Sequence, residues 1–229
     1  MSSEVSKMSS TEEDSVYENT NGMPMAGGRN LHMEVGHGEV ANRIVTVGSQ
    51  QRASKIAAFL DTTTPITTIT SSRGFTTITG TYNNVPVSIV AIGMGPSMMD
   101  FFVRETRAVV KGPMAIVRFG TCGGLVPAAN AGVVAVATKG SGFVTRDPNA
   151  FAYNYGNNNE KDDSYSKKYI MSKIAPSEDS LSSLVVSQLK EAVGEAAVIE
   201  GANVTAESFY SSQGYMIYFF SNYYVILYY

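Results

Sequence analysis

The sequence predicts one α/β domain built on a mixed β-sheet with helices on both faces. Three observations carry this prediction. Short β-branched runs, beginning with "NRIVTVG" (42–48), alternate with stretches whose apolar residues recur at helical spacing. Hairpin signals interrupt the alternation, so the strands cannot all be parallel. The 229 residues are enough to bury a single sizeable core.

The first half of the chain predicts four strands and two helices. The strand over 42–48 ends in Gly48, and Ser49 is placed to cap a following helix over 49–61. Alternating Ile and Thr residues then predict strands, and the two asparagines of "YNNVP" predict a hairpin turn between the last two of them. The remaining expected elements are strands over 66–70, 75–82 and 86–92, and a helix over 96–110.

The second half continues the pattern with longer connections. The run "MAIVRF" (114–119) predicts a strand that leads directly into a glycine-rich loop. Leucines and valines at helical spacing predict a helix over 177–195. Single strands are expected over 132–140 and 196–205, and the polar stretch 155–168 is expected to be a loop.

Composition narrows the class of function. The net charge is −3 with no basic run, which argues against a nucleic-acid surface and favours a small-molecule ligand. No run reaches the roughly 20 apolar residues of a membrane span. The single cysteine excludes an intrachain disulfide framework and fits a reducing, cytoplasmic compartment. Residues 1–28 are polar, acidic and rich in serine, so we expect a disordered tail and not a signal peptide.

The stretch "IVRFGTCGGL" (116–125) predicts an anion site. Arg118 stands at the end of a buried strand, where open α/β sheets place their ligands, and a buried guanidinium needs an anionic partner. The glycines that follow allow close approach of backbone N–H groups, and Thr121 adds a hydroxyl donor. This donor set suits phosphate. The alternative is a structural pair between Arg118 and a carboxylate beside a glycine-rich turn.

Two more arginines stand near the start of a predicted element, Arg52 near a helix start and Arg73 at a strand start. Gly48 and Arg52 flank a helix start, where free N–H groups attract anions, and Arg73 lies in "SSRGF". Both arginines could instead be solvated surface cations. The loop "GMGPS" (93–97) can hold a phosphate or only turn the chain, and neither a phosphate-loop lysine nor a metal-ligand cluster accompanies it.

The stretch "TAESFYSSQG" (205–214) offers recognition of a planar base. Phe209 can stack on such a base, and the amide of Gln213 can both donate to and accept from its edge. The alternative is a core aromatic residue followed by a loop amide. Cys122 is a weak candidate nucleophile because His32 and His37, the only possible bases, lie far away in sequence.

Together and in order, these motifs resemble the nucleoside phosphorylase family, and most closely its uridine phosphorylase branch. The matching stretches are "VGSQQR", "SSRGFTTITG", "GMGPS", "VRFGTCGGL" and "VTAESFYSSQG", and the resemblance covers about residues 31–214. It implies a three-layer α/β/α subunit in a homodimer or higher homo-oligomer. It also implies phosphorolysis, in which uridine and inorganic phosphate give uracil and ribose 1-phosphate. Phosphate is then a co-substrate, and no cofactor or metal is expected.

The resemblance assigns a role to each candidate residue. Arg118 and Gln213 would be catalytic: Arg118 would hold phosphate beneath the sugar, and Gln213 would steady the charge that develops on the leaving base. Arg73 and His32 would reach the phosphate and the ribose 5′-hydroxyl bound by a neighbouring subunit. His32 could instead be a surface residue before the first strand. The phosphate set is Gly48, Arg52, Arg73, Arg118 and Thr121, and the nucleoside set is His32, Phe209 and Gln213.

The resemblance ends after Gly214. Tyr215 stands where the family usually has an arginine, and a Met-Glu pair that grips the ribose hydroxyls is missing. We therefore expect a partial phosphorylase domain over 29–214, with an incomplete sheet, and an atypical Tyr-rich tail over 215–229 that either promotes aggregation or fills a vacant strand position. Alternative functions follow: an inactive relative that binds phosphate or oligomerises without turnover, or a purine-specific enzyme, although Gln213 favours uracil.

Overall fold

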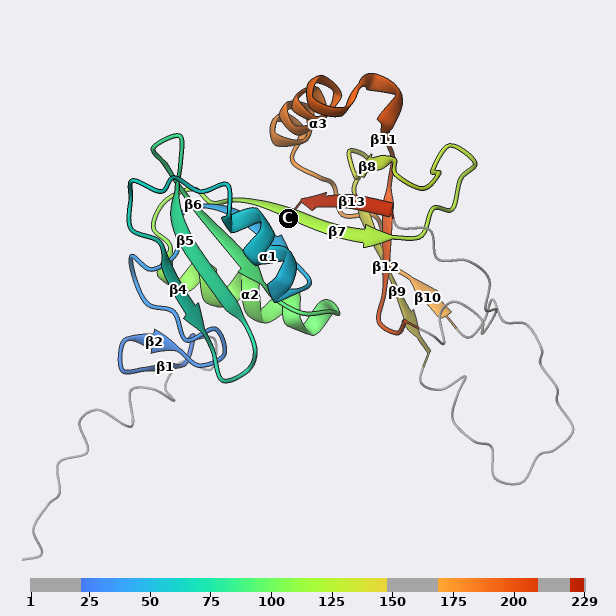
Figure 1. Cartoon of the computed structure of the whole chain (residues 1–229). Helices are drawn as coiled ribbons and strands as arrows, with labels where there is room; N and C mark the ends of the chain where they lie inside the picture. The colour runs from blue at the N-terminus through green and yellow to red at the C-terminus, as the bar shows by residue number, and fades with distance from the viewer. Residues whose placement is uncertain (1–21, 148–168, 210–222, 229) are drawn as a thin grey trace, which may run out of the picture.

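The computed structural model describes residues 22–147, 169–209 and 223–228, and over these it has a mixed α/β fold (Figure 1). Three helices accompany strands of three sheets in the described residues. The helices are α1 (Gln50–Ala57), α2 (Pro96–Val109) and α3 (Asp179–Val193), with a short 3-10 turn at Glu195–Ala197. The strands are β1 (Met25–Ala26), β2 (Arg29–Asn30), β3 (Arg43–Val47), β4 (Thr67–Thr70), β5 (Thr76–Tyr82), β6 (Val85–Ala91), β7 (Ala115–Cys122), β8 (Val134–Val136), β9 (Ser141–Arg146), β10 (Tyr169–Met171), β11 (Val198–Glu200), β12 (Asn203–Ala206) and β13 (Tyr223–Tyr228).

The main sheet contains eight of the described strands in the order β11-β8-β13-β7-β3-β6-β5-β4. Its centre is parallel: β3 pairs with β7, with Thr46 opposite Arg118, and with β6, with Val47 opposite Ala91. The carboxyl ends of β7, β3 and β6 therefore meet at one edge of the sheet. That edge is where α/β proteins of this kind bind ligands.

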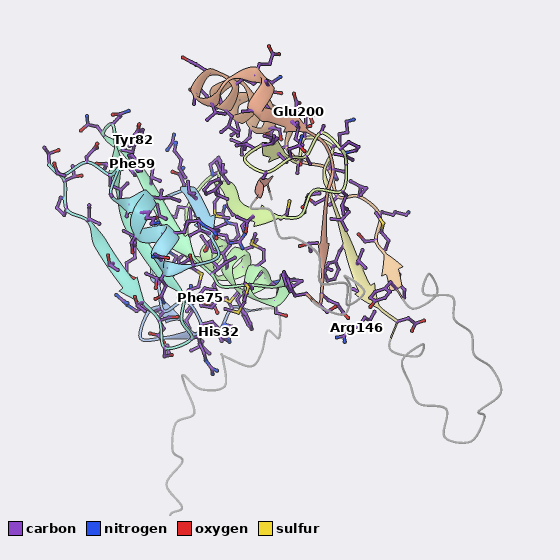
Figure 2. All side chains as sticks on the ribbon, turned by 45° about the vertical axis from the view of Figure 1, so that its right-hand side comes forward. His32, Phe59, Phe75, Tyr82, Arg146 and Glu200 are labelled. Carbon is purple, nitrogen blue, oxygen red and sulfur yellow. The ribbon has the colours of Figure 1, made fainter. Side chains whose placement is uncertain are left out.

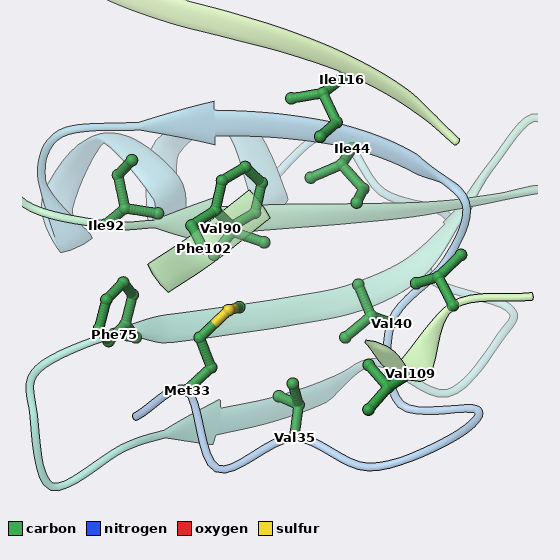
Figure 3. Packing of buried hydrophobic residues seen from close by; sticks show 11 residues of the cluster. Met33, Val35, Val40, Ile44, Phe75, Val90, Ile92, Phe102, Val109 and Ile116 are labelled. Carbon is green, nitrogen blue, oxygen red and sulfur yellow. The ribbon is translucent and has the colours of Figure 1, made fainter. Parts of the chain in front are cut away.

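Helices cover both faces of this sheet, as the sequence predicts. On one face, Phe102 of α2 is fully buried in a cluster with Ile44 of β3 and Val90 of β6 (Figure 3). On the other face, Ala53 of α1 packs against Val47 of β3. Helix α3 lies on the α1 side, since its cluster shares Phe119 of β7 with the cluster of α1; the layers are thus α/β/α.

The predicted hairpin between β5 and β6 is confirmed. Tyr82 pairs with Val85, and Asn83 and Asn84 take positive φ angles of 50° and 63°. A two-residue turn in which both residues have positive φ matches the twist of the flanking strands. Asparagine tolerates positive φ better than most residues. The predicted helices at 49–61, 96–110 and 177–195 and the strands from 42 to 92 also form, with ends shifted by a few residues.

Two predicted boundaries are wrong. The strand expected over 114–119 continues to Cys122. Gly120, Thr121 and Cys122 were expected in the glycine-rich loop, but they pair with β13. The single strand expected over 196–205 is two strands in different sheets: β11 pairs with β8, whereas β12 pairs with β9. Strands β9, β10 and β12 form a separate sheet in the order β10-β9-β12 that the sequence analysis did not predict.

The described residues near both ends of the sequence form strands, although tails were expected there. Met25–Ala26 forms a short antiparallel pair with Arg29–Asn30, so the disordered tail expected over 1–28 does not extend to residue 28 in the described part. Strand β13 lies antiparallel to β7 and parallel to β8, which bears out the expectation that the Tyr-rich ending fills a strand position. The predicted loop 155–168 lies outside the described residues. Among the helices that are described, none has the length and apolarity of a membrane span.

Candidate functional site

Arg118 and Gly48 meet at the carboxyl edge of the main sheet. A Cβ placed on Gly48 would lie 3.4 Å from the carbonyl oxygen of Gly93 and 3.7 Å from Nη2 of Arg118. The guanidinium of β7 therefore reaches the chain segment that follows β3, and the absence of a side chain at residue 48 keeps that space open. The sequence predicted this pairing of Arg118 with Gly48 only through the resemblance.

Helix α1 begins immediately beside this point. Ser49 caps the helix, and its hydroxyl accepts the backbone N–H of Arg52 at 3.2 Å. The half-buried Arg52 belongs to the first turn, so its backbone and the positive end of the helix dipole lie at the same edge of the sheet as Arg118. Two of the predicted phosphate residues, Gly48 and Arg52, are thus brought to the end of the strand adjacent to Arg118.

The loop after β6 contributes a second helix start. Gly93 and Gly95 have φ angles of 75° and 94°, which an L side chain rarely adopts, and Pro96 opens α2. Gly95 is the N-cap residue of α2, and since glycine has no side chain, no side chain caps this helix start. The backbone of Ile92 donates to the Val47 carbonyl at 2.9 Å, which holds this loop against the end of β3. Backbone N–H groups of two helix starts therefore border the edge that carries Arg118.

Thr121 and Cys122 extend this edge along β7. Thr121 is exposed, and its backbone lies opposite Tyr224 of β13. Cys122 is half-buried, and burial raises the pKa of its thiol. A raised pKa leaves little of the reactive thiolate near neutral pH. This agrees with the prediction that Cys122 is a poor candidate nucleophile.

A cavity of about 650 Å³ lies between the start of α2 and the ends of β9 and β12. Two aromatic side chains, Phe101 and Phe143, line it together with charged groups. The Nε of Arg146 donates to Oε1 of Glu207 at 2.6 Å. This hydrogen bond is the largest cause of a lowered pKa for the Glu207 carboxyl and a raised pKa for Arg146. Asp100, Pro96 and Ser97 complete the lining.

Phe209 follows this cavity along the chain, two residues after Glu207, and 53% of its surface is exposed. This exposure does not fit the alternative of a core aromatic residue, and a role of Phe209 in covering a ligand stays a prediction. Gln213 lies outside the described residues, so its role stays a prediction.

His32 and Arg73 lie in segments that are joined to each other. Glu34 accepts from the backbone N–H of Ser72 at 3.0 Å and from its hydroxyl at 2.5 Å. Arg73 is exposed in the turn before β5, and the His32 side chain is 29% exposed. Figure 2 shows His32 next to the Phe75 end of the domain, with Arg146 on the separate strands beside it. The two residues expected to reach a neighbouring subunit therefore share one region of the surface.

Sequence reasoning missed Glu105, the buried partner of His32. Glu105 is 1% exposed, and its Oε1 lies 2.5 Å from Nδ1 of His32. The contact spans 73 positions of sequence, so no local motif links the two residues. The sequence offered one signal for Glu105, which is a charged residue on the inward-facing side of the helix predicted over 96–110. Within the described ranges, no three His, Cys, Asp or Glu side chains gather in a way that could hold a metal ion.

Comparisons with known proteins agree on a family. A family model described as the phosphorylase superfamily matches residues 42–227. A structure from work on two uridine phosphorylases of the oomycete Phytophthora capsici aligns with a TM-score of 0.76 and 44% identity, over 89% of this chain and 72% of that one. A nucleoside phosphorylase of Trypanosoma brucei, described as showing uridine phosphorylase activity, shares the fold at a TM-score of 0.63 and 19% identity, over 84% of this chain and 71% of that one.

The curated relatives carry a different substrate name. A DeoD-type purine nucleoside phosphorylase of Geobacillus sp. (strain WCH70) is 32% identical over 112 residues, which are 48% of this chain and 46% of that protein. The corresponding Bacillus thuringiensis (strain Al Hakam) protein is 34% identical over 96 residues, 42% of this chain and 39% of its own. The chain thus spans less than half the length of these curated relatives.

Proposed function

The chain belongs to the phosphorylase superfamily, and we propose that it serves the phosphorolysis of a pyrimidine nucleoside, with uridine as the substrate. The observation that carries this proposal is the convergence of Arg118, Gly48 and two helix starts at one sheet edge. A guanidinium and backbone N–H groups are hydrogen-bond donors that suit inorganic phosphate. The 44% identity to a structure from work on uridine phosphorylases supports uridine over other nucleosides.

In the proposed reaction phosphate is the nucleophile, so the protein has to position the two substrates and stabilise charge, and it needs no nucleophile of its own. A phosphate oxygen forms a bond to the anomeric carbon of the ribose while the bond from that carbon to the base nitrogen breaks. The base leaves with the electron pair and takes up the proton that the hydrogen phosphate ion loses, giving uracil and ribose 1-phosphate. Phosphate held by Arg118, Arg52 and Thr121 would stabilise the positive charge on the sugar before it bonds. Gln213 would donate to the leaving base.

The first test is uracil release from uridine by this 229-residue chain, with and without inorganic phosphate. We expect release only with phosphate, together with one ribose 1-phosphate for each uracil. Equal release in both conditions would indicate hydrolysis and would overturn the proposal. Absence of release from a folded chain that binds phosphate in calorimetry would favour the alternative of an inactive relative.

A purine nucleoside is the second candidate substrate, because the curated relatives that match are purine nucleoside phosphorylases. Inosine and uridine, supplied at equal concentrations with phosphate, distinguish the two. We expect kcat/KM to be higher for uridine, since the amide of Gln213 matches the edge of uracil with one donor and one acceptor. A higher value for inosine would assign the chain to the purine branch.

A further inference from the structure

We propose that Glu105 is a positioning residue that fixes the protonation pattern of the His32 ring, so that Nε2 of His32 is presented as a hydrogen-bond acceptor. The proposal rests on the proposed function for its substrate, since the group that Nε2 would accept from is the 5′-hydroxyl of a nucleoside bound by a second copy of the chain.

Glu105 is held as an acceptor by two convergent backbone donors. Its Oε2 accepts the backbone N–H of Met33 at 2.8 Å, and both carboxylate oxygens lie 3.2 Å from the backbone nitrogen of His32. Backbone N–H groups can only donate, so both oxygens of the carboxyl group face donors. Nδ1 of His32 lies 2.5 Å from Oε1, and beside an oxygen that accepts, we infer that this ring nitrogen donates.

The ring is fixed in orientation as well as in hydrogen bonding. It stacks on Phe101 with ring centroids 4.0 Å apart and an interplanar angle of 29°. Phe101 and Glu105 stand four residues apart on α2, so one face of that helix supplies both contacts. With Nδ1–H donated to Glu105, the other ring nitrogen of a neutral imidazole carries a lone pair. The ring edge that is left for a ligand therefore accepts a hydrogen bond from a hydroxyl group.

The Glu105→Gln variant should reverse this pattern. Its single side-chain oxygen must still face the backbone N–H groups of His32 and Met33, because those donors cannot become acceptors. The amide NH₂ group then faces Nδ1, which has to accept, and the ring proton moves to Nε2. The variant thus converts Nε2 of His32 from an acceptor to a donor with almost no change in side-chain volume.

The ring protonation is measured directly by ¹⁵N NMR of the full chain above about pH 8, where a free imidazole is neutral. The chain has two histidines, and the spectrum of His37→Gln assigns the signals of His32. We expect the proton on Nδ1 in the wild-type protein and on Nε2 in Glu105→Gln. A wild-type ring protonated on Nε2, alone or together with Nδ1, would overturn the proposal without any variant having to fold.

Substrate preference supplies the second readout. The probes are uridine and 5′-O-methyluridine, whose 5′ oxygen can accept but not donate. We expect the preference for uridine, as a ratio of kcat/KM values, to fall by about 3- to 10-fold in Glu105→Gln, the size of one neutral hydrogen bond. Because the methyl group is present in both assays, its bulk cancels in the comparison.

Asn30→Ala is the matched control. Asn30 anchors the same segment by donating to the Glu105 carbonyl at 3.1 Å and accepting from the Val35 N–H at 3.1 Å, but it does not touch the ring. We expect a lower Tm with an unchanged ring proton and an unchanged preference. Equal effects of Asn30→Ala and Glu105→Gln on the preference would reduce Glu105 to a structural anchor. If the chain does not turn over uridine at all, the proposed function fails while the NMR result still decides the role of Glu105.

Discussion

At the scale of single residues, the candidate phosphate site depends on the shape of the Arg118 side chain as well as its charge. A guanidinium presents a fixed planar fork of donors, whereas an ammonium is a compact point charge. Arg118 reaches from β7 to the segment after β3, next to Gly48. A lysine at this position keeps the charge but loses the paired donors that match two phosphate oxygens.

The Arg118→Lys variant should therefore weaken phosphate binding. We expect the KM for phosphate, or the Kd from calorimetry, to rise roughly 10- to 100-fold, because hydrogen bonds between charged groups contribute about 1.5–3 kcal/mol each. Arg43→Lys is the control, since Arg43 is exposed at the opposite end of the adjacent strand and donates only to Asn42 among the contacts described. Similar changes for both variants would mean that net charge, and not a site, governs phosphate binding.

At the scale of elements, the sequence predicted what local patterns encode. The turn of Asn83 and Asn84, the cap at Ser49 and the strand β5 each follow from a few neighbouring residues, and all three are present. Gly48 and Arg118 were predicted as members of one site only through the resemblance, and the structure brings them together. The split of 196–205 could not be predicted, since it depends on which distant strand each half pairs with.

The contacts that hold the segments of His32 and Arg73 were beyond sequence reasoning for the same reason. The contact from His32 to Glu105 spans 73 positions, and the contact from Glu34 to Ser72 spans 38. The first contact fixes His32 itself, and the second fixes Ser72, the residue before Arg73. Such contacts arise from the packing of whole elements, so a single sequence indicates the functional residue but not the residue that holds it.

The link between Glu34 and Ser72 leads to a prediction about pH. The hydroxyl and backbone N–H of Ser72 lower the pKa of the Glu34 carboxyl below its ordinary value of 4.5. A carboxyl whose pKa is depressed on folding stabilises the folded state above the unfolded pKa, and this stabilisation is lost as the pH falls through the folded value. In Glu34→Gln we expect urea midpoints that are lower near neutral pH and that fall less steeply below pH 4.5 than in the wild-type protein.

The matched variant for this experiment is Glu195→Gln, because the Glu195 side chain is 88% exposed and its nearest described cation, Lys190, lies at 4.0 Å. It should follow the wild-type pH profile. Since Ser72 precedes Arg73, Glu34→Gln should also loosen the turn that presents Arg73. A pH profile of Glu34→Gln that overlays the wild-type profile would show that the hydrogen bonds to Ser72 add nothing to stability.

At the scale of the whole molecule, β13 joins two parts of the main sheet. In the strand order, β11 and β8 lie on one side of it and β7, β3, β6, β5 and β4 on the other. Among the described strands, β7 and β8 are connected within the sheet only through β13, although α3 also packs across from β8 and β11 to Val117 and Phe119 of β7. The Tyr-rich ending therefore contributes backbone hydrogen bonds to two neighbours, at the same residues of β7 that border the candidate phosphate site.

Placing a proline in β13 tests this arrangement. Val225 lies opposite Gly120 of β7 and Ala135 of β8, so its N–H points to a neighbouring strand whichever way it faces. Val225→Pro removes that donor and leaves a carbonyl without its partner, which should lower the free energy of unfolding in urea by at least about 2 kcal/mol. Thr67→Pro, at the first residue of edge strand β4, should cost less, since proline is tolerated at edges and strand starts. If Val225→Pro is as stable as the wild-type protein, with unchanged hydrogen exchange at Gly120 and Ala135, then β13 does not hold the two parts of the sheet together.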